Sequence, residues 1–382
     1  METPLFSVIT PSLNQGQFIE ETIKSVISQE GDFYIEYIIM DGGSSDNTLN
    51  IIKKYEGLLK NKGQGLRCRG VEFRWVSEKD NGQSDAINKG FKMAKGDIFA
   101  WINSDDAFYE GAFSIVHKHF LENPAHDIVY GNGAIIDEQG EVVQGWRSRR
   151  YDLKALKSYH FRWHEFSNYI LQPTVFLRKG VFDKIGPLDE TLHYAMDIEY
   201  WIRAGEHGLG LCHINKRLAK FRMTKGTKTS SSPTVFWEEQ LEVFRRHNRD
   251  TKMRRFFAEY FYSLSIHNGF DIPAAKKEFN ATLKRWACLP ADELNGLNEE
   301  AGKGLQTGLL KIANEAFLKG ERAKAEIAAG EAIMSAPLLR MHPLNMFFCV
   351  KKLLGRKVSL ILSGIYRNAL KTCWHMRYNT RG

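Results

Sequence analysis

The chain has 382 residues, and its 43% hydrophobic content is ample for one sizeable domain plus a smaller one. The formal net charge is +8, and residues 340–382 hold many Lys and Arg but no acidic residue. A nucleic acid, an anionic membrane surface or an anionic substrate would each explain this excess. Because no RNP, zinc-finger or other nucleic-acid signature accompanies the charge, we do not expect nucleic-acid binding.

The five cysteines are odd in number, lie far apart and show no CxxC spacing. This pattern argues against a disulfide framework and against a zinc site, and it favours a reducing, cytoplasmic compartment. The N-terminal residues lack the basic region and long apolar run of a signal peptide, and no stretch of about 18 apolar residues predicts a membrane span. We therefore expect a cytoplasmic protein.

Four apolar runs near the N-terminus predict buried strands, and each is followed by a loop of small and polar residues. The runs are residues 6–10, 37–40, 73–76 and 99–102. Helices are predicted after the first three loops, at residues 18–27, from about residue 49, and at residues 86–94. The repeated order of strand, loop and helix predicts a parallel α/β sheet with right-handed crossovers. All the polar loops then lie at one edge, where such folds bind nucleotides.

The fourth predicted strand runs directly into Asn103, Ser104, Asp105 and Asp106. Hard cations such as Mg²⁺ or Mn²⁺ prefer carboxylate oxygens and often complete their coordination with substrate phosphates. The same residue types also form ordinary solvated turns. Taken alone, this stretch leaves a metal site and a turn open.

Five motifs taken in order resemble the family 2 glycosyltransferases that have the GT-A fold. They are residues 8–14, 40–46, 80–90, 95–97 and 103–106. The resemblance implies a GT-A domain over residues 1–230, with a Rossmann-like, mostly parallel α/β sheet flanked by helices. It also implies that a sugar passes from a nucleotide-diphosphate donor to a hydroxyl group with inversion, and that the reaction depends on Mn²⁺ or Mg²⁺.

By the same resemblance, Asp105 binds the metal directly and Asp106 supports it. The residues implied to bind the nucleotide are Pro11, Leu13, Asp41, Gln83, Asp85, Asn103 and Ser104. Two of these positions depart from the family pattern. Asn103 stands where the family has a leading Asp, and Leu13 stands where an aromatic side chain would stack on the base.

Residues 195–203 resemble the start of the family's helix that carries the general base, and Asp197 falls at the position of this base. A carboxylate there would take the proton of the acceptor hydroxyl. Glu199 is the alternative base, and a helix cap is the alternative role for Asp197. Residues 128–137 resemble the family's next strands, and residues 172–190 resemble the segment on the acceptor side. Further contacts with the acceptor or the diphosphate are expected from Gln172, Glu199, Trp201, Arg203, Arg222 and Lys225.

Residues 221–229 resemble a family strand whose His helps to bind the metal or the diphosphate, but Thr224 occupies that His position. Metal binding would then rest on Asp105 and the diphosphate. Compensating positive charge or a substitute ligand is expected from Arg222, Lys225, Lys228, His160, His164 or His193. Solvated lysines and structural histidines are the alternative interpretation of these residues.

From about residue 233 the pattern becomes helical, and we expect an all-α region over residues 231–382. Residues 307–337 look like one tetratricopeptide-type hairpin, which is too short for a solenoid and would pack on the catalytic domain or on a second copy of the chain. Residues 346–378 predict a basic amphipathic helix. This helix would either make a peripheral membrane contact, at the inner face of the cell membrane, or pack against protein.

The leading hypothesis is a glycosyltransferase that uses a UDP-sugar, with GDP- and dTDP-sugars as alternatives. Its acceptor would be a glycan or a lipid-linked molecule in bacterial surface polysaccharide or lipopolysaccharide biosynthesis. Asn103 and Thr224 keep open the alternative of a non-catalytic nucleotide-sugar-binding or scaffolding protein. A sugar nucleotidyltransferase is disfavoured, because the loop at Pro11 has no basic residue to bind a triphosphate.

Overall fold

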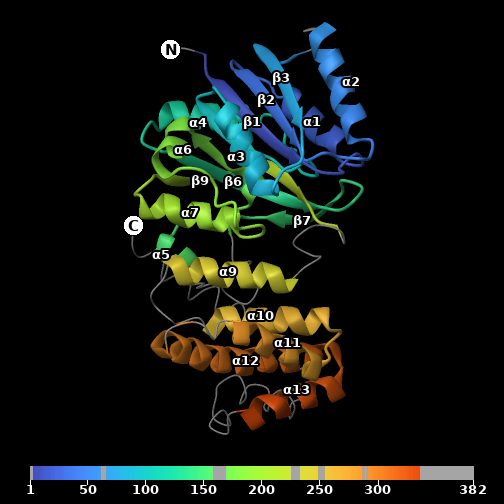
Figure 1. Cartoon of the computed structure of the whole chain (residues 1–382), viewed down its shortest axis with the longest axis vertical. Coiled ribbons are helices and arrows are strands. Elements are labelled where there is room, and N and C mark those ends of the chain that lie inside the picture. Colours follow the sequence, from blue (N-terminus) through green and yellow to red (C-terminus); the bar gives the residue numbers. More distant parts are fainter. Residues whose placement is uncertain are drawn as a thin grey trace. The chain divides into compact units, whose positions relative to one another are not determined.

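The computed structural model describes residues 3–61, 66–157, 169–224, 233–247, 254–285, 289 and 291–335 (Figure 1). The chain forms two compact units, Met1–Asn248 and Arg249–Gly382. The sequence suggested a division at residue 230. The structure instead includes α9 (Pro233–His247) in the first unit, where His247 at its end contacts Glu206 of α7 (Met196–Glu206).

The described part of the first unit is built on one nine-stranded sheet, in the order β3-β2-β1-β4-β8-β6-β9-β5 with β7 paired to β6. The strands are β1 (Leu5–Ser12), β2 (Tyr34–Asp41), β3 (Gly70–Ser77), β4 (Ile98–Trp101), β5 (Ala107–Phe108), β6 (Ile128–Ile136), β7 (Val142–Trp146), β8 (Phe176–Arg178) and β9 (Leu211–Arg222). The first four strands are parallel, while β8 runs antiparallel to both β4 and β6. The carboxyl ends of β1, β2, β3 and β4 therefore share one edge.

Helices cover both faces of this sheet. The main ones are α1 (Ile19–Ile27), α2 (Thr48–Asn61), α3 (Gln83–Met93), α4 (Ala112–Glu122), α6 (Lys179–Ile185) and α7, with the short α5 (Leu153–Lys157) and a 3₁₀ turn at Gln172–Thr174. Strand β4 shows how the alternation of side chains divides the two layers. Ile98 and Ala100 join the core cluster that includes side chains of α1, α2 and α4. On the other face, Phe99 stacks on Phe91 of α3 and Trp101 stacks on Trp201 of α7.

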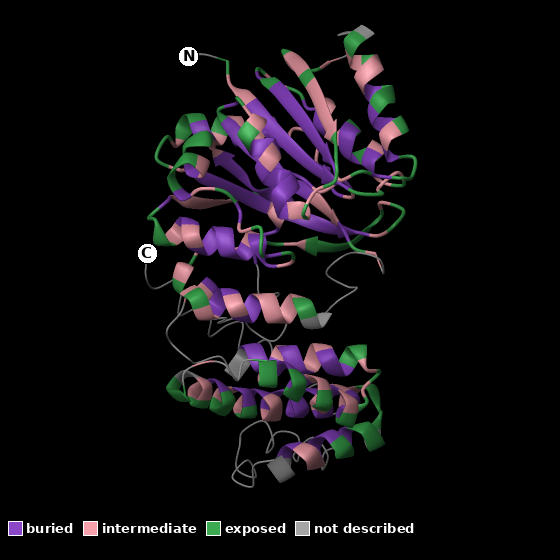
Figure 2. Ribbon diagram, in the orientation of Figure 1, coloured by how far each residue is buried: buried purple, intermediate pink, exposed green. Residues whose placement is uncertain are grey.

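All four strands predicted near the N-terminus are present. The first three extend beyond their predicted ends, and the fourth, β4, is shifted by one residue toward the N-terminus. The predicted helices that follow them are α1, α2 and α3. Residues 128–137 were expected to form the family's next strands, and Ile128–Ile136 form the single strand β6. Figure 2 shows that β1, β2 and β4 are buried over most of their length, as the apolar runs predicted.

The described part of the second unit consists of helices, namely α10 (Arg254–His267), α11 (Ile272–Arg285), α12 (Ala291–Lys319) and α13 (Arg322–Ser335). Helices α12 and α13 pack together, and Gly320 joins them with a φ of 84° that favours glycine. This hairpin includes residues 307–335 of the predicted one, although its first helix begins earlier, at Ala291. The predicted amphipathic helix at residues 346–378 lies outside the described residues.

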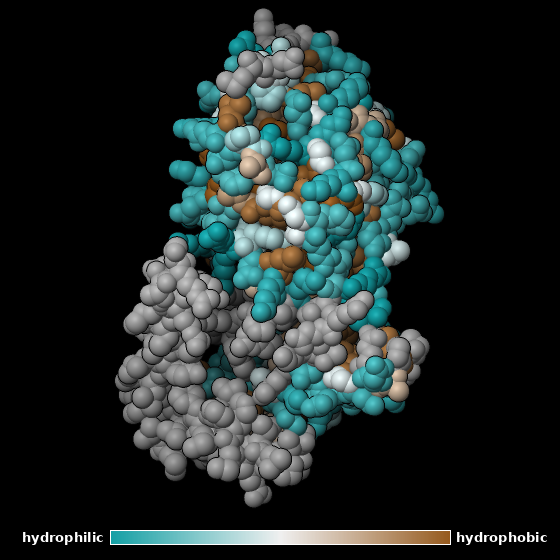
Figure 3. Space-filling view, turned by 90° about the vertical axis from the view of Figure 1, so that its left-hand side faces the viewer, coloured by the Kyte–Doolittle hydropathy of each residue, from teal (hydrophilic) through white to brown (hydrophobic). Residues whose placement is uncertain are grey.

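No described helix is long and apolar enough to cross a membrane. Figure 3 shows one face of the molecule, on which hydrophilic residues dominate the described surface and apolar residues gather only in separate spots.

Candidate active site

The loops that follow β1 and β2 are joined by hydrogen bonds. The strands end side by side, with Ser12 paired to Asp41. The backbone N–H of Asn14 donates to Ser44 Oγ over 2.7 Å, and Asn14 Oδ1 accepts from the N–H of Ser45 over 2.9 Å. Asn14 has a φ of 53°, a left-handed conformation that Asn adopts more readily than most residues. These bonds fix the two loops into one surface at the edge of the sheet.

Asp41 orders the loop that follows it. Its carboxylate is almost fully buried and accepts hydrogen bonds from the N–H groups of Gly43 and Ser44, at 3.1 and 3.0 Å, and from Ser77 Oγ at 2.6 Å. A Cβ atom at Gly42 would lie only 2.6 Å from Asp80 Oδ2, so glycine permits this close approach. The contact of Asp41 with a nucleobase stays a prediction.

The end of β1 also carries side chains that suit a ligand. Leu13 is 52% exposed, although it is apolar, while Pro11 before it is buried. The hydroxyl of Ser12 is buried and has no hydrogen-bond partner among the described residues. A buried polar group without a partner costs free energy, and a ligand can satisfy it. The sequence did not single out Ser12, because a serine at a strand end gives no distinct signal.

In the acidic motif after β4, Asp106 serves the fold. Its side chain is 1% exposed. Oδ1 accepts from the backbone N–H of Arg222 over 2.8 Å, and Oδ2 accepts from Asn103 Nδ2 over 3.3 Å. Burial, together with the charge of Asp105, raises the pKa of the Asp106 carboxyl well above its usual range.

Asp105 is arranged differently. It is less buried than Asp106, and burial raises the pKa of its carboxyl. Apart from its own backbone N–H, no group in the described parts of the chain donates a hydrogen bond to its carboxylate. Asp105 is therefore the acid of this pair that remains available to a ligand. Its oxygens are hard donors that fit Mn²⁺ or Mg²⁺, whose other ligands would come from water or substrate.

Asn103 connects the acidic motif to α3. Its Oδ1 accepts a hydrogen bond from Gln83 Nε2 over 2.6 Å, while its Nδ2 donates to Asp106. The amide accepts from one neighbour and donates to the other, whereas an ionised carboxylate has no proton to donate. The departure of Asn103 from the family pattern thus has a physical reason in this chain.

Arg222 at the end of β9 holds the backbone of the motif. It is 1% exposed, its Nε donates to the carbonyl oxygen of Asp105 over 2.8 Å, and its Nη1 donates to that of Asp137 over 2.7 Å. Its remaining nitrogen pairs with Glu21. Arg222 thus holds the fold around the motif, and its expected contact with the diphosphate stays a prediction. Thr224 is partly buried, and Lys225, Lys228, His160 and His164 lie outside the described residues.

Asp197 lies in the first turn of α7, and its Oδ1 accepts from the N–H of Ile198 over 2.7 Å. Helix α3 holds the segment that leads to it. Ser84 Oγ donates to the carbonyl oxygen of Leu192 over 2.9 Å, and the ring of His193 lies 3.2 Å from the position of a Cβ on Gly82. Since Gln83 of the same turn bonds Asn103, these contacts bring the segment before Asp197 to the neighbourhood of the acidic motif.

The same segment is held from its other side by Glu239 of α9. The carboxylate accepts hydrogen bonds from the backbone N–H groups of His193, Tyr194 and Ala195, at 2.8, 2.6 and 3.1 Å respectively. These bonds matter because Ala195, the N-cap of α7, makes no side-chain cap. The sequence did not indicate Glu239, because it lies far along the chain from the residues that it binds.

Structural contacts engage Glu199, Arg203 and Trp201, and their expected contacts with the acceptor or the diphosphate stay predictions. Glu199 is buried and forms two hydrogen bonds with Arg203, at 2.9 and 2.8 Å, so it is a poor candidate for the base. Burial raises the pKa of Glu199, but hydrogen bonds from His247 and Arg203 outweigh this effect and leave its pKa below the usual value. Trp201 is fully buried and stacks on Trp101 with ring centroids 5.4 Å apart.

The other predicted site residues lie along the same edge. Gln172 Nε2 donates to the carbonyl oxygen of Trp101 over 2.9 Å, directly before the acidic motif. Ser104 is buried within this motif. Asp85 accepts from the N–H of Asn81 over 2.9 Å and pairs with Lys89 at 3.1 Å, so its carboxylate orders the loop before α3.

A mostly parallel sheet, with polar loops and an acidic pair at its carboxyl edge, agrees with the GT-A fold that the sequence predicted. Residues 7–186 match the family model described as Glycosyl transferase family 2. Residues 7–186 therefore form a glycosyltransferase domain of this kind.

Two curated relatives and one solved structure are similar to this chain. An uncharacterised glycosyltransferase of Methanocaldococcus jannaschii is 24% identical over 224 residues, which cover 58% of this chain and 72% of the relative. A PGL/p-HBAD biosynthesis glycosyltransferase of Mycobacterium bovis is 28% identical over 213 residues, 53% of this chain and 70% of the relative. The crystal structure of S. aureus TarS matches with a TM-score of 0.51 at 18% identity, over 82% of this chain and 55% of TarS. This likeness shows that the fold is GT-A-like.

Proposed function

We propose that this chain transfers a sugar with inversion from a nucleotide-diphosphate donor, in a reaction that depends on Mn²⁺ or Mg²⁺. A UDP-sugar is the leading donor, with GDP- and dTDP-sugars as alternatives. The acceptor is a hydroxyl group of a glycan or of a lipid-linked molecule in surface polysaccharide biosynthesis. The mycobacterial relative is named for a biosynthetic process, PGL/p-HBAD biosynthesis, which supports a biosynthetic role.

The main support for this proposal is the difference between the hydrogen bonding of Asp105 and that of Asp106. Asp106 is fully engaged by Arg222 and Asn103, whereas the carboxylate of Asp105 remains available beside it. Two neighbouring acids whose charged forms are disfavoured would gain stability from a cation. When bound, a divalent metal would supply Lewis-acid charge at the leaving diphosphate.

Asp197 is the proposed general base. The acceptor oxygen attacks the anomeric carbon, the bond from that carbon to the diphosphate oxygen breaks, and the acceptor proton passes to the Asp197 carboxylate. The fold supports this assignment because Ser84 and Glu239 fix the segment before Asp197 from two sides. A fixed base can contribute to the rate because its approach to the acceptor is already ordered.

The nucleotide would lie against the joined loops after β1 and β2. Leu13 offers an exposed apolar surface to the base, and Ser12 offers an unpaired hydroxyl. Since Asp41 already uses its oxygens to order the loop, we propose that it contributes chiefly through this ordering.

Donor binding and transfer can be tested separately. We would screen UDP-, GDP- and dTDP-sugars with Mn²⁺ for a rise in melting temperature, because a ligand that binds only the folded state stabilises it. Release of the nucleoside diphosphate would then report turnover. The variants to compare are Asp105→Asn, Asp197→Asn and Asp183→Asn, the last of which changes an exposed residue of α6.

Asp105→Asn should lose most of the Mn²⁺-dependent stabilisation by the donor, together with turnover. Asp197→Asn should keep donor binding and lower turnover by about 100-fold or more, the scale of general-base catalysis. Asp183→Asn should behave like the wild type. A wild-type protein that binds donors but never releases the diphosphate would contradict catalysis and favour the nucleotide-sugar-binding alternative.

A further inference from the structure

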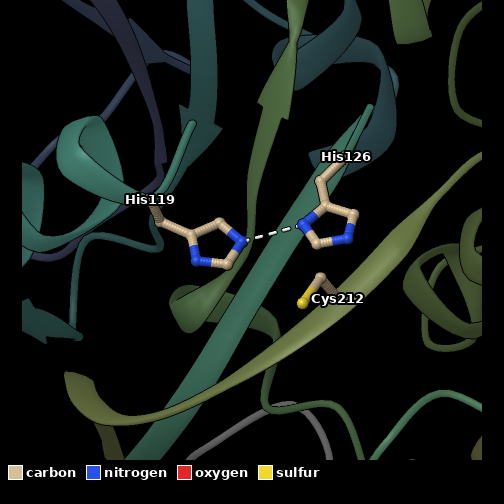
Figure 4. Close-up of side chains that lie close together, drawn as sticks. All are labelled: His119, His126 and Cys212. Atoms are coloured by element: carbon tan, nitrogen blue, oxygen red, sulfur yellow. Dashed lines mark hydrogen bonds between the residues drawn. The ribbon is translucent and has the colours of Figure 1, made fainter. Parts of the chain in front are cut away.

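A second cluster of metal-ligating side chains lies outside the candidate active site (Figure 4). It consists of His119 in the last turn of α4, His126 in the turn before β6, and Cys212 near the start of β9. One ligand atom of each residue lies within 4.8 Å of the other two. Among the described residues, this is the group of three His, Cys, Asp or Glu side chains close enough to hold a metal ion. The sequence indicated no zinc site, because the ligands come from three separate segments.

The cluster lies at the edge of the sheet opposite the acidic motif. Strands β6 and β9 are parallel, and Val129 of β6 pairs with Cys212 of β9 near their amino ends. Strands β4 and β6 both run antiparallel to β8, so they share one direction. Asp105 follows the carboxyl end of β4, whereas His126 precedes the amino end of β6. The two sites are therefore distinct.

The two imidazole rings are already close to the spacing that a metal requires. His119 Nε2 and His126 Nδ1 are 3.0 Å apart and share a hydrogen bond. With zinc–nitrogen bonds of about 2.0–2.1 Å, two nitrogens of a tetrahedral site lie about 3.3–3.4 Å apart. A small outward turn of the rings would replace the shared proton with a metal ion. In Figure 4 the thiol of Cys212 lies beside this pair.

The backbone around the ligands is fixed by hydrogen bonds. Asn123 bonds the carbonyl oxygen of His119 through its backbone N–H at 2.9 Å and through its side chain at 3.0 Å, and the N–H of His126 donates to the carbonyl oxygen of Asn123 over 3.1 Å. The Asp127 carboxylate accepts from the N–H of Gly210 over 2.8 Å, which holds the turn before Cys212. The three ligands are thus presented on a rigid frame, as preorganised metal sites require.

We propose that His119, His126 and Cys212 bind a Zn²⁺ ion, with water in the fourth position. Two imidazoles and a thiolate are the ligands that zinc prefers, whereas Mn²⁺ and Mg²⁺ prefer oxygen. The ion joins α4, the turn before β6 and β9 at one point. Since β9 ends at Arg222, which holds the acidic motif, the ion steadies the far end of a strand on which the active site depends. Its effect is on stability, because binding to the folded state alone stabilises that state.

Cobalt substitution tests this site without reference to activity. The full-length protein would be treated with a chelator, titrated with Co²⁺ and followed by absorption spectroscopy. We expect the visible bands of tetrahedral Co²⁺ and a thiolate-to-cobalt charge-transfer band, both displaced by one equivalent of Zn²⁺. A metal held by Asp105 has only oxygen ligands from the chain and gives no thiolate band, so the two sites are distinguished. Zn²⁺ should also raise the melting temperature of the chelator-treated protein.

The variants Cys212→Ser and His126→Gln identify the ligands. Cys212→Ser should lose the charge-transfer band, and His126→Gln should weaken Zn²⁺ binding by about 100-fold or more, because even changes around metal ligands cost 10–100-fold. If one variant does not fold, the other still decides. Matched controls are Cys68→Ser, which removes another half-buried thiol, and His117→Gln on the same helix as His119. Both controls should keep the band. A wild-type protein without a thiolate band, or a band that survives Cys212→Ser, would overturn the proposal.

Discussion

Within the acidic motif, the side chains of Asn103, Asp105 and Asp106 have different roles. Asp106 accepts hydrogen bonds from the fold, Asn103 supplies one of them, and Asp105 is left available to a ligand. The sequence alone predicted the motif, because its residue types and its position after an apolar run can be recognised without the structure. The roles depend on Gln83 and Arg222, which reach the motif only when the chain is folded. For that reason the sequence indicated only that Asn103 departs from the family pattern, and it gave no reason for the amide.

Asn103→Asp, which would restore the usual family residue, should destabilise this protein. The new carboxylate would still accept the hydrogen bond from Gln83, but it could not donate one to Asp106. It would also add a negative charge near Asp105 and Asp106, whose carboxyl pKa values are already raised. Leaving the buried Asp106 carboxyl group without this hydrogen bond lowers the free energy of unfolding by about 1–3 kcal/mol. We expect a lower melting temperature in the presence of EDTA, by about 2–4 °C for each kcal/mol in a protein of this size.

The matched control for this prediction is Asn50→Asp, which makes the same change on an exposed residue of α2. It should leave the melting temperature nearly unchanged. An Asn103→Asp variant that melts at the wild-type temperature would show that the donated bond to Asp106 is not the reason for the amide.

At the scale of elements, the position of α7 depends on helices before and after it in the chain. Asn88 of α3 bonds both the N–H and the carbonyl oxygen of Leu188, at 2.9 Å each, and Glu239 of α9 bonds the turn just before α7. The sequence predicted α3 and the start of α7 from apolar spacing and motifs. It could not predict these bonds, because each joins residues that are distant in the chain and polar in ways that many solvated side chains share.

Removing the Glu239 carboxylate should slow transfer without weakening donor binding. Glu239→Ala leaves the N–H groups of residues 193–195 without their acceptor, so the turn that positions Asp197 loosens. A small misplacement of a catalytic group can cost up to about 100-fold in rate. We expect a lower kcat with an unchanged Kd for the donor, because the donor-binding loops follow other elements.

Two comparisons sharpen the Glu239 test. Glu239→Gln keeps an oxygen acceptor and should recover part of the rate, which a general loss of folding would not allow. Glu110→Gln changes an exposed glutamate and should behave like the wild type. Equal losses of kcat and donor affinity in Glu239→Ala would indicate that the helix supports the whole site rather than the base.

The contact between α7 and α9 should also depend on pH through His247. Hydrogen bonds to Glu199 and Glu206 raise the pKa of His247. The same two acids also pair with bases, Glu199 with Arg203 and Glu206 with Lys157. The folded state therefore binds the proton more tightly than the unfolded state. Its contribution to stability is full below the unfolded pKa of about 6.5 and is lost as the pH rises through the folded pKa.

His247→Gln should accordingly lower the free energy of unfolding more at pH 6 than at pH 9, by a difference on the order of 1 kcal/mol. Both pH values lie above the pKa range of Glu199 and Glu206, so these two acids stay charged at each pH. Thermal unfolding of the variant and the wild type at both pH values measures the effect. His267→Gln, on an exposed residue of α10, is the matched control. A loss that grows with pH would refute the assigned sign.

For the whole molecule, the apolar runs and the loops after them predicted the sheet and the edge where its polar loops meet. This worked because strands buried on both faces leave a strong apolar signal. Short strands such as β5 and β8 gave no comparable signal, since two or three residues show no period. The division between the units was placed too early, because the amphipathic pattern of α9 does not reveal that it packs on α7.

Every described residue that we assign to donor binding or catalysis, from Pro11 to Glu239, lies in the first unit, Met1–Asn248. This unit also contains the complete sheet and the cluster of buried side chains around Phe6 and Phe113. We therefore expect a fragment of residues 1–248 to unfold cooperatively and to bind UDP in the presence of Mn²⁺. Its Kd, measured by calorimetry, should lie within about a factor of three of that of the full chain, because the fragment contains every described residue that we assign to the donor. The fragment carrying Asp105→Asn should bind UDP far more weakly, which ties the measured affinity to the acidic motif. A folded fragment that does not bind UDP would show that the second unit completes the site.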